Sequence, residues 1–249
     1  MDLSGNTVLI TGGATGIGFR MAEAFVRAGN EVLVCGRRDE KLELARRALP
    51  DLKAMSCDVA APGDRERLAG WAESRGVNVL VNNAGMQRML DLTDGPGPLE
   101  TGDNELRCNL EGPIYLTARL VPHLRQVPNA AVVNVTSGLG FVPVARMPVY
   151  CAAKAALHSF SVSLRHQLAP VGIGVFELVP PMVDTELDRG ARAERGQVYR
   201  GIAPEEVSEA LMAGLAEDRF EIAVAGAADL MRRAREDFEG AFASMNPRG

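Results

Sequence analysis

A glycine-rich turn near the N-terminus constrains the fold of this chain more than any other feature. A short apolar run at residues 7–10 precedes the turn and has the composition of a β-strand. Apolar side chains then recur at helical spacing until Gly29, a residue type that favours the C-terminal end of a helix. The pattern therefore predicts a strand, a tight turn and a helix in succession. The turn itself reads Thr11-Gly12-Gly13-Ala14-Thr15-Gly16-Ile17-Gly18.

The same turn is suited to binding a dinucleotide. Glycines permit positive φ angles and a close approach of the backbone to a ligand, and the N-terminus of the following helix favours a pyrophosphate group. The spacing is Gly-x-x-x-Gly-x-Gly, which differs from the general Gly-x-Gly-x-x-Gly fingerprint. A glycine turn that binds no ligand is the alternative.

Strand-like runs alternate with helical segments along the whole chain. This alternation predicts an α/β fold, namely a Rossmann-like doubly wound parallel sheet of about seven strands with helices on both faces. The 249 residues, 47% of them hydrophobic, suffice for one large core, and no linker or internal repeat divides them. We therefore expect a single domain over residues 1–249, with ligands at the carboxyl ends of the strands. The runs lie near residues 7–11, 31–35, 53–57, 77–82, 130–136, 174–179 and 220–224.

Two arginines after the second strand-like run bear on the choice of cofactor. Arg37 lies 19 residues past Gly18, close to where a carboxylate would bind the ribose hydroxyls of NAD. Neither Cys35 nor Gly36 offers a carboxylate, whereas Arg37 and Arg38 suit bidentate contact with a 2′-phosphate. We therefore expect NADP(H) to be preferred over NAD(H). The alternative is that both arginines merely begin a solvated helix.

Tyr150 and Lys154 are spaced as a catalytic pair on a predicted helix. Positions i and i+4 share one helix face, so the lysine ammonium is expected to lie near the phenol. Positive charge favours the phenolate, and a phenol that exchanges a proton near neutral pH is a general acid/base. Such pairs also occur by chance on helix surfaces, so the assignment depends on the other motifs.

Together these motifs resemble the short-chain dehydrogenase/reductase family, over nearly the whole chain. Asp58 matches the position that contacts adenine in that family, and Asn82-Asn83-Ala84-Gly85 reproduces one of its motifs unchanged. The resemblance implies NAD(P)-dependent oxidoreductase activity. It also implies cofactor contacts, besides those of the two arginines and the Tyr-Lys pair, from Gly12, Thr15, Gly16, Ile17, Gly18, Asp58, Val59, Asn83, Ala84, Gly85, Pro180, Val183 and Thr185.

The resemblance implies a catalytic set of Asn109, Ser137, Tyr150 and Lys154. Tyr150 would protonate a carbonyl oxygen in reduction, or accept the alcohol proton in oxidation, and Ser137 would hydrogen-bond the same oxygen. Lys154 would favour the phenolate and bind the nicotinamide ribose, and Asn109 would hold a water that links Lys154 to solvent. The expected reaction is reversible hydride transfer between NADP(H) and a carbonyl/alcohol pair.

One segment departs from the family pattern. After the sixth strand-like run the family usually has Pro-Gly, whereas this chain has Pro180-Pro181. A second proline removes a backbone donor and fixes φ, so we expect a stiffer loop beside the nicotinamide. The Pro-Pro form and the tail are similar to a bacterial subset named after a D-alanylation operon, a name that does not define a substrate.

Charge and composition exclude several kinds of partner. The net charge is −5 and the basic residues are scattered, so no nucleic-acid partner is expected. No apolar run is long enough to span a bilayer and the first residues lack a signal-peptide pattern, so we expect a cytoplasmic protein without membrane contact. The cysteines and histidines show no metal-ligand spacing, so we expect no metal and reduced thiols. Cys151, beside Tyr150, is either a reactive thiol or, as we favour, buried filler.

The expected substrate is a small, moderately hydrophobic ketone, aldehyde or alcohol. Specificity is expected from Met86, Gln87, Arg88 and residues 139–147, which are mostly apolar. Residues 183–203 carry arginines and few apolar anchors, and we interpret them as a lid over the substrate. A solvated helix is the alternative for this segment.

We expect a homodimer rather than a homotetramer. The helices that carry Asn109 and Tyr150 have apolar stripes, which by family analogy pair across a two-fold axis. The tail at residues 226–249 is amphipathic and is expected to cover the surface that the family uses for a second interface; a frayed tail is the alternative. The stripes comprise Ile114, Leu116 and Leu120 on one helix and Leu157, Phe160 and Leu164 on the other.

Two other function classes fit part of the sequence. A non-catalytic NADP sensor would need the glycine turn but not Tyr150 and Ser137, both of which are present. An epimerase or dehydratase acting on nucleotide sugars would use the same Tyr-Lys pair. Those enzymes usually carry a larger C-terminal substrate domain, and little chain remains here after residue 225.

Overall fold

A seven-stranded sheet forms the centre of the protein, which we describe from a computed structural model of residues 1–100, 104–188 and 201–247. All neighbouring strands are parallel, in the order β3-β2-β1-β4-β5-β6-β7. Every strand overlaps one of the runs predicted from the sequence, which confirms the predicted fold. The strands are β1 (Thr7–Thr11), β2 (Glu31–Gly36), β3 (Lys53–Ser56), β4 (Val79–Asn82), β5 (Ala131–Val135), β6 (Gly174–Val179) and β7 (Glu221–Ala223).

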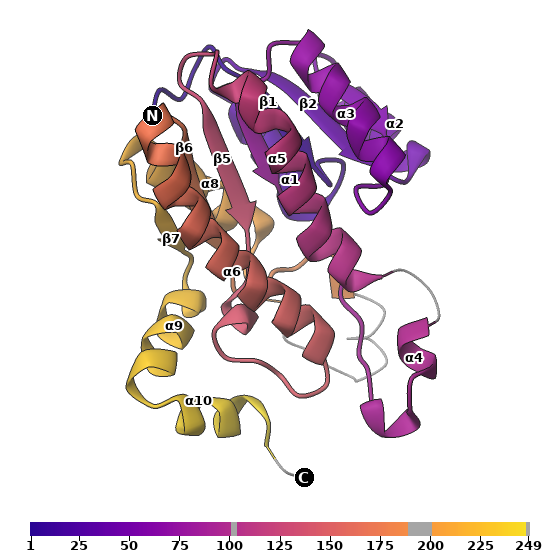
Figure 1. Cartoon of the computed structure of the whole chain (residues 1–249), viewed down its shortest axis with the longest axis vertical. Coiled ribbons are helices and arrows are strands. Elements are labelled where there is room, and N and C mark those ends of the chain that lie inside the picture. Colours follow the sequence, from indigo (N-terminus) through magenta and orange to yellow (C-terminus); the bar gives the residue numbers. More distant parts are fainter. Residues whose placement is uncertain (101–103, 189–200, 248–249) are drawn as a thin grey trace.

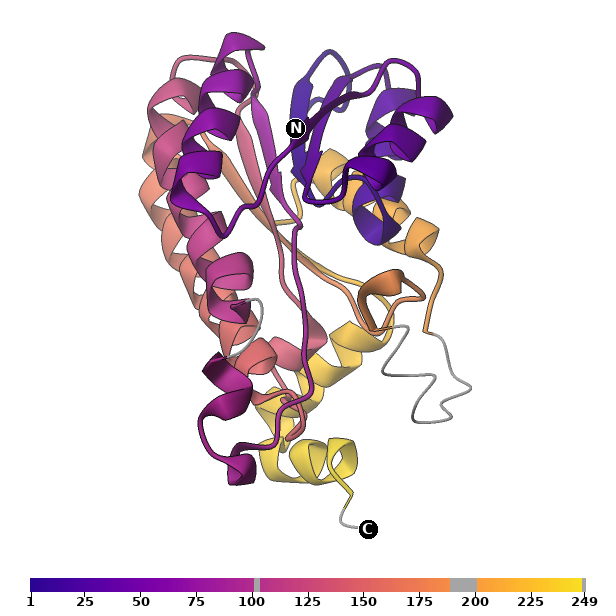
Figure 2. The same cartoon turned by 90° about the vertical axis from the view of Figure 1, so that its right-hand side faces the viewer.

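Helices cover both faces of the sheet (Figure 2). On one face lie α1 (Gly16–Arg27), α2 (Asp39–Ala48) and α8 (Pro204–Ala216), which bury side chains such as Phe25 and Leu211 against the strands. On the other face lie α3 (Pro62–Ser74), α5 (Gly112–Leu124) and α6 (Pro148–Leu168), with Leu68 and Leu120 in the second core. The molecule is therefore doubly wound, as predicted.

The central strands are apolar on both faces because each face packs under a helix layer. In β4, Val79 and Val81 belong to one core and Leu80 to the other, and all three are fully buried. Side chains of a strand alternate between faces, so a strand buried on both sides needs a continuous apolar run. This requirement explains why runs of Val, Leu and Ile identified the strands in the sequence.

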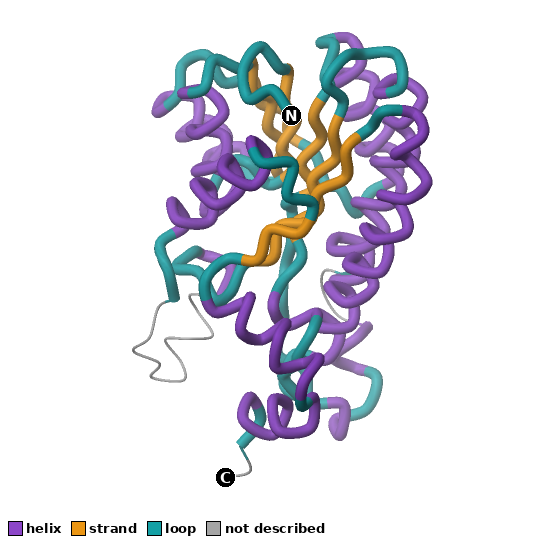
Figure 3. The backbone as a smooth tube through the Cα atoms, turned by 90° about the vertical axis from the view of Figure 1, so that its left-hand side faces the viewer, coloured by secondary structure: helices purple, strands orange, loops and turns teal. Residues whose placement is uncertain are grey.

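The order of the strands reverses between β1 and β4, which are neighbours in the sheet although β2 and β3 separate them in sequence. Connections from β1 and β4 therefore run to opposite faces, and the carboxyl ends of these strands border a crevice between the helix layers. Figure 3 shows the strands between the two helix layers.

Several short elements gather beyond the carboxyl ends of the strands, in the lower part of Figure 1. The final helices pack on the same chain: Ala227 and Met231 of α9 are buried against Val179 and Phe141. None of the described helices is long and apolar enough to cross a membrane. These short elements are η1 (Leu92–Asp94), α4 (Gly97–Glu100), η2 (Arg107–Glu111), η3 (Gly138–Gly140), η5 (Glu186–Asp188), α9 (Gly226–Glu236) and α10 (Phe238–Met245). One further short element, η4 (Ala169–Val171), joins α6 to the start of β6 at the opposite end of the sheet.

The apolar stripes that were predicted to pair between subunits are mostly buried within one subunit. Leu116, Leu120 and Leu164 pack in the core between the sheet and its helices, and Leu157 is only 1% exposed. That part of the interface prediction is wrong, because a helix on a parallel sheet turns its apolar stripe toward the strands.

A network of buried polar side chains joins the sheet to α6. The Glu177 carboxylate of β6 is fully buried, and it accepts hydrogen bonds from Thr136 Oγ1 at 2.7 Å and from His158 Nδ1 of α6 at 2.8 Å. Asn134 Nδ2 of β5 donates to Ser161 Oγ of α6 at 2.9 Å. Buried polar groups need such partners, so these bonds fix α6 relative to the end of β5.

The role of His158 was not expected from the sequence. Its hydrogen bond to Glu177 raises its pKa, against a smaller opposing effect of burial. The ligand atoms of His158, Glu177 and Glu221 lie within 4.8 Å of one another. The hydrogen bonds from Thr136 and His158 already satisfy the Glu177 carboxylate, so we interpret the group as an ion pair.

We predict that His158→Gln destabilises the protein by about 1–3 kcal/mol, the usual cost of removing a partner from a buried polar group. The pKa of His158 is raised in the folded state. The ion pair therefore contributes its full stabilisation below the unfolded-state pKa of about 6.5, and this stabilisation is lost as the pH rises through the folded-state pKa. Urea unfolding should therefore show that His158→Gln lowers the free energy of unfolding more at pH 6 than at pH 9. His166→Gln, exposed on the same helix, is the control; a loss that is independent of pH would contradict the prediction.

Candidate active site

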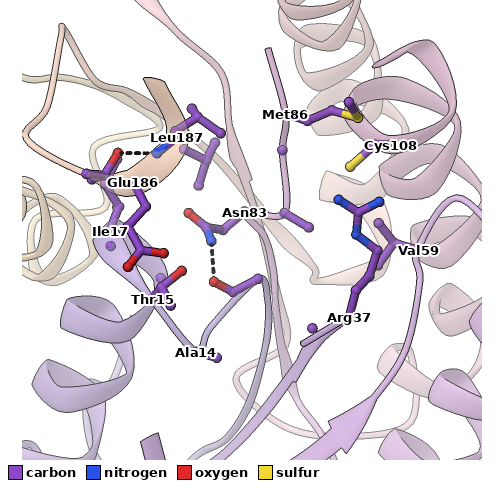
Figure 4. A pocket seen from close by; sticks show the side chains of 18 of the residues that line it. Ala14, Thr15, Ile17, Arg37, Val59, Asn83, Met86, Cys108, Glu186 and Leu187 are labelled. Atoms are coloured by element: carbon purple, nitrogen blue, oxygen red, sulfur yellow. Dashed lines mark hydrogen bonds between the residues drawn. The ribbon is translucent and has the colours of Figure 1, made fainter. Parts of the chain in front are cut away.

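A cavity of about 350 Å³ opens at the carboxyl ends of the strands, beside β1 and β4. Figure 4 shows Thr15, Ile17, Glu186 and Leu187 on one wall and Arg37, Val59, Cys108 and Met86 on the other, with Asn83 between them. Its size is within the usual range of ligand pockets, about 300–1,000 Å³. The sequence predicted ligands at the carboxyl ends of the strands, and the cavity lies there, beside the switch in strand order.

Hydrogen bonds between the ends of β1 and β4 form the base of the cavity. Thr11 Oγ1 accepts from the backbone N–H groups of Asn83 and Ala84, both at 3.0 Å. In return, Asn83 Nδ2 donates to the carbonyl oxygens of Thr11 at 2.9 Å and Gly12 at 3.2 Å. These reciprocal bonds hold the glycine turn against the segment after β4.

Two glycines of the turn have no room for a side chain. Gly12 has φ = +65°, and a Cβ there would lie 2.9 Å from Ala84 Cα. A Cβ on Gly18 would lie 2.3 Å from the carbonyl oxygen of Gly12. The turn therefore packs tightly on itself and on the segment after β4, which leaves the N-terminus of α1 facing the cavity. Backbone N–H groups and a helix N-terminus together fit a pyrophosphate.

Basic side chains line the cavity where β2 ends and α2 begins. Arg37, Arg38 and Lys41 all line it. Lys41 was not predicted as a site residue; it lies in the first turn of α2, just after the two arginines. Lys41 Nζ lies 2.8 Å from Glu186 Oε1, and Arg38 Nη1 lies 3.1 Å from Glu186 Oε2.

Tyr150 and Lys154 line the cavity, and Ser137 lies beside Tyr150, next to the lining residue Thr136. All three are buried, and a hydrogen bond joins the Ser137 and Tyr150 side chains. Lys154 Nζ donates to the carbonyl oxygen of Val135 at 2.7 Å and lies 5.8 Å from the centre of the Tyr150 ring. One turn of α6 supplies the tyrosine and the lysine, and the end of β5 supplies the serine.

Burial controls the protonation of both ionisable groups. Desolvation raises the pKa of Tyr150 to about 12, despite a smaller opposing effect of the Ser137 hydrogen bond. Desolvation also lowers the pKa of Lys154 to about 8. From the sequence we expected Lys154 to lower the pKa of Tyr150; in the protein alone the direction is opposite, because loss of water around the phenol dominates. The phenol is therefore protonated at neutral pH and able to donate.

Asn109 lies in η2, a π-helical turn immediately before α5. Its side chain is fully buried and bonds both ways to the backbone of Met86: Oδ1 accepts from Met86 N at 2.9 Å, and Nδ2 donates to Met86 O at 2.7 Å. A Cβ on Gly85 would lie 3.2 Å from Asn109 Oδ1 and 3.8 Å from Lys154 Nζ. Asn109 thus fixes the segment after β4 next to Lys154.

Nearly all residues predicted to bind the cofactor line this one cavity. Val183 does not; it is buried and pairs with Ile202 in an isolated bridge. Residues 189–200 of the predicted lid lie outside the described residues. The predicted residues that line the cavity are Gly12, Thr15, Gly16, Ile17, Gly18, Arg37, Arg38, Asp58, Val59, Asn83, Ala84, Gly85, Tyr150, Lys154, Pro180 and Thr185.

Three cysteines also line the cavity and were not predicted to do so. Cys35 and Cys57 lie at the ends of neighbouring strands, and a hydrogen bond between the two thiols, together with burial, raises the pKa of Cys35. Cys108 lies on the wall with Met86 (Figure 4). Burial also raises the pKa of Cys151, which favours an unreactive thiol at that position.

The C-terminal helix α10 and Asn246 pack close to Tyr150. Met245 packs against the cluster of Val144, Met147 and Tyr150. Asn246 holds the loop before α6, because its Nδ2 donates to Pro143 O at 3.0 Å and its Oδ1 accepts from Ala145 N at 2.6 Å. The sequence predicted that this tail covers a surface that the family uses for a second interface; in the structure the tail contacts the loop predicted to set specificity.

Comparisons with known proteins agree with this site. A family model described as short chain dehydrogenase matches residues 6–196. The chain is 45% identical to DltE of Bacillus subtilis strain 168, described as an uncharacterized oxidoreductase, over 99% of this chain and 98% of that protein. A short chain dehydrogenase from Burkholderia cenocepacia J2315, solved in complex with NADP, is 26% identical, with a TM-score of 0.85 over 98% of this chain and 99% of that one. A short chain dehydrogenase/reductase from Burkholderia phymatum, solved in complex with NAD, is 23% identical, with a TM-score of 0.82 over 96% of each chain, and shows the shared fold.

Proposed function

Since this chain is an oxidoreductase that belongs to the short-chain dehydrogenase family, we propose that it transfers a hydride reversibly between NADP(H) and a carbonyl/alcohol substrate. The match to DltE also confirms the resemblance to the subset named after a D-alanylation operon. The observation that carries the proposal is that Tyr150 and Lys154 line a cavity with a glycine-turn base, and that Ser137 is hydrogen-bonded to Tyr150.

The residues present fit a nicotinamide dinucleotide. The backbone at Gly12 and Gly18 forms a surface that a Cβ would fill, and the start of α1 faces the cavity. Asp58 and Val59 line the part next to Arg37, which suits the adenosine. When bound, the cofactor supplies or accepts the hydride. Gly85, Pro180 and Thr185 would hold its nicotinamide half beside Tyr150 and Lys154.

Tyr150 acts as the general acid in reduction. Its phenol is protonated at neutral pH, since its pKa is raised to about 12, and it donates to the substrate carbonyl oxygen. Ser137 hydrogen-bonds the same oxygen and orients it. In oxidation Tyr150 must accept the alcohol proton, which requires added positive charge nearby. Lys154, with a pKa of about 8, supplies part of that charge and binds the nicotinamide ribose.

The substrate is a small, moderately hydrophobic carbonyl or alcohol compound. Apolar side chains of Val144, Met147 and Met245 pack around Tyr150 and support this class. The loop at residues 139–147 and the C-terminal helix α10 would form the walls that select the substrate. We propose that the protein acts in the cytoplasm. Its four cysteines form no disulfide, which supports this setting.

We predict that Tyr150→Phe reduces kcat by about 10²–10⁴-fold, the usual contribution of a positioned general acid. NADPH affinity should change by less than about twofold, because the hydroxyl serves the proton step. Lys154→Ala should impair both turnover and cofactor binding. Steady-state rates with a panel of ketones and aldehydes, together with fluorescence titration of NADPH, measure these effects.

The same assay separates the alternative functions. An NADP sensor would bind NADPH without turnover of any carbonyl compound, and an epimerase would act on a nucleotide sugar without net change in NADPH. Near-normal turnover by Tyr150→Phe would refute the assigned role of the phenol.

We also propose that NADP(H) is preferred over NAD(H), with Arg37 and Arg38 binding the 2′-phosphate. Loss of a charge-assisted contact costs about 1.5–3 kcal/mol. Arg37→Ala should therefore weaken NADPH binding about tenfold or more and leave NADH binding nearly unchanged. Arg27→Ala, far along α1 from the cavity, is the control. Equal affinities for the two cofactors in the unmodified protein would refute the preference.

For assembly, we propose a homodimer formed by the outer faces of α5 and α6. Tyr115 of α5 is 60% exposed and Val162 of α6 is 47% exposed, and an isologous interface between these faces would cover both. The docked tail argues against a second interface beside it. Light scattering should give the mass of two chains, and Tyr115→Glu with Val162→Glu should shift it to one. A tetramer mass would show that the tail does not block the second interface.

A further inference from the structure

The carboxylate of Glu186 lies between two basic side chains at the mouth of the cavity. Its Oε1 is 2.8 Å from Lys41 Nζ and its Oε2 is 3.1 Å from Arg38 Nη1. Lys41 and Arg38 belong to the start of α2, whereas Glu186 follows β6, so the two ion pairs join opposite sides of the cavity. All three residues line it.

The position of Glu186 is set by its neighbours in the chain. Thr185 is buried beside the glycine turn, where a Cβ on Gly16 would lie 3.1 Å from Thr185 Cγ2. The Thr185 hydroxyl accepts from Leu187 N at 3.4 Å, which turns the chain around Glu186. Glu186 is therefore held by a packed segment at the wall opposite Arg37 (Figure 4).

Electrostatics keep Glu186 charged. The hydrogen bond from Lys41, and then that from Arg38, hold the pKa of Glu186 below its ordinary value. A carboxylate and a phosphate use the same donors, because both accept charge-assisted hydrogen bonds from ammonium and guanidinium groups. Two of the donors that could bind a 2′-phosphate, Arg38 and Lys41, are thus already engaged by an anion of the protein itself.

We propose that Glu186 occupies the place of the cofactor 2′-phosphate and sets the affinity for phosphorylated cofactor. This inference rests on the proposed function and deepens it. NADP(H) has to displace the Glu186 carboxylate from Lys41 and Arg38, whereas NAD(H) has no group that competes for them. Glu186 therefore weakens NADP(H) binding selectively, and the preference is smaller than Arg37, Arg38 and Lys41 would give alone.

The test measures binding of the adenosine half of the cofactor, without turnover. Isothermal titration compares adenosine 2′,5′-bisphosphate with adenosine 5′-monophosphate on the unmodified protein and on Glu186→Gln. We expect Glu186→Gln to raise the affinity for the bisphosphate by about threefold to tenfold, since it removes two partly exposed ion pairs of modest strength. The affinity for the monophosphate should change by less than about twofold.

Two further variants show whether the effect is local. Glu43→Gln removes the same charge from α2, where Glu43 pairs with Arg46 and is not among the described residues that line the cavity; it should leave bisphosphate affinity unchanged. In a Lys41→Met background, Glu186→Gln should increase the bisphosphate affinity by a smaller factor, because the effects of substitutions at residues in contact are not additive.

An unchanged or lower bisphosphate affinity in Glu186→Gln would overturn the proposal, as would an equal gain for the monophosphate. A protein that binds neither nucleotide would refute the cofactor site and the proposal with it. If the unmodified protein binds NADPH and NADH equally while Glu186→Gln prefers NADPH, the cofactor preference is wrong and the role of Glu186 stands.

Discussion

The active-site cavity depends on the hydrogen bonds that join the ends of β1 and β4. Thr11 and Asn83 exchange side-chain and backbone hydrogen bonds there, between residues 72 positions apart in sequence. They hold the glycine turn against the segment after β4, where the strand order reverses. The cavity, the exposed start of α1 and the position of Gly85 beside Lys154 all follow from this junction.

Packing at the ends of the strands also sets the protonation of Tyr150 and Lys154, the proposed catalytic groups. Tyr150 and Lys154 lie under the end of β5, where water is excluded. Burial raises the pKa of Tyr150 and lowers that of Lys154, so it favours the neutral form of each side chain. Buried polar partners keep α6 in place: Glu177 binds His158, and Asn134 binds Ser161. Hydrogen bonds that join α6 to β5 and β6 therefore fix the positions of Tyr150 and Lys154, the proposed catalytic pair.

The charges across the cavity mouth, which we propose to act in cofactor binding, contribute little to the stability of the fold. Arg38, Lys41 and Glu186 are partly exposed, and ion pairs of that kind add little to stability. Their importance is local, because they stand where a phosphate would bind. A protein can change its cofactor affinity at such positions with little effect on its folding.

The sequence by itself determined the strands, the turn and the shared helix face of Tyr150 and Lys154, because each depends on near neighbours. Continuous apolar runs marked the strands, and the i,i+4 spacing placed Tyr150 and Lys154 on one helix face. Only the tertiary structure decided which faces are buried: Leu116 and Leu120 turn to the core. It alone brought Glu186 to Lys41 and His158 to Glu177, and it set the direction of the Tyr150 pKa shift, because contacts between distant segments and the loss of water exist only once the chain has packed.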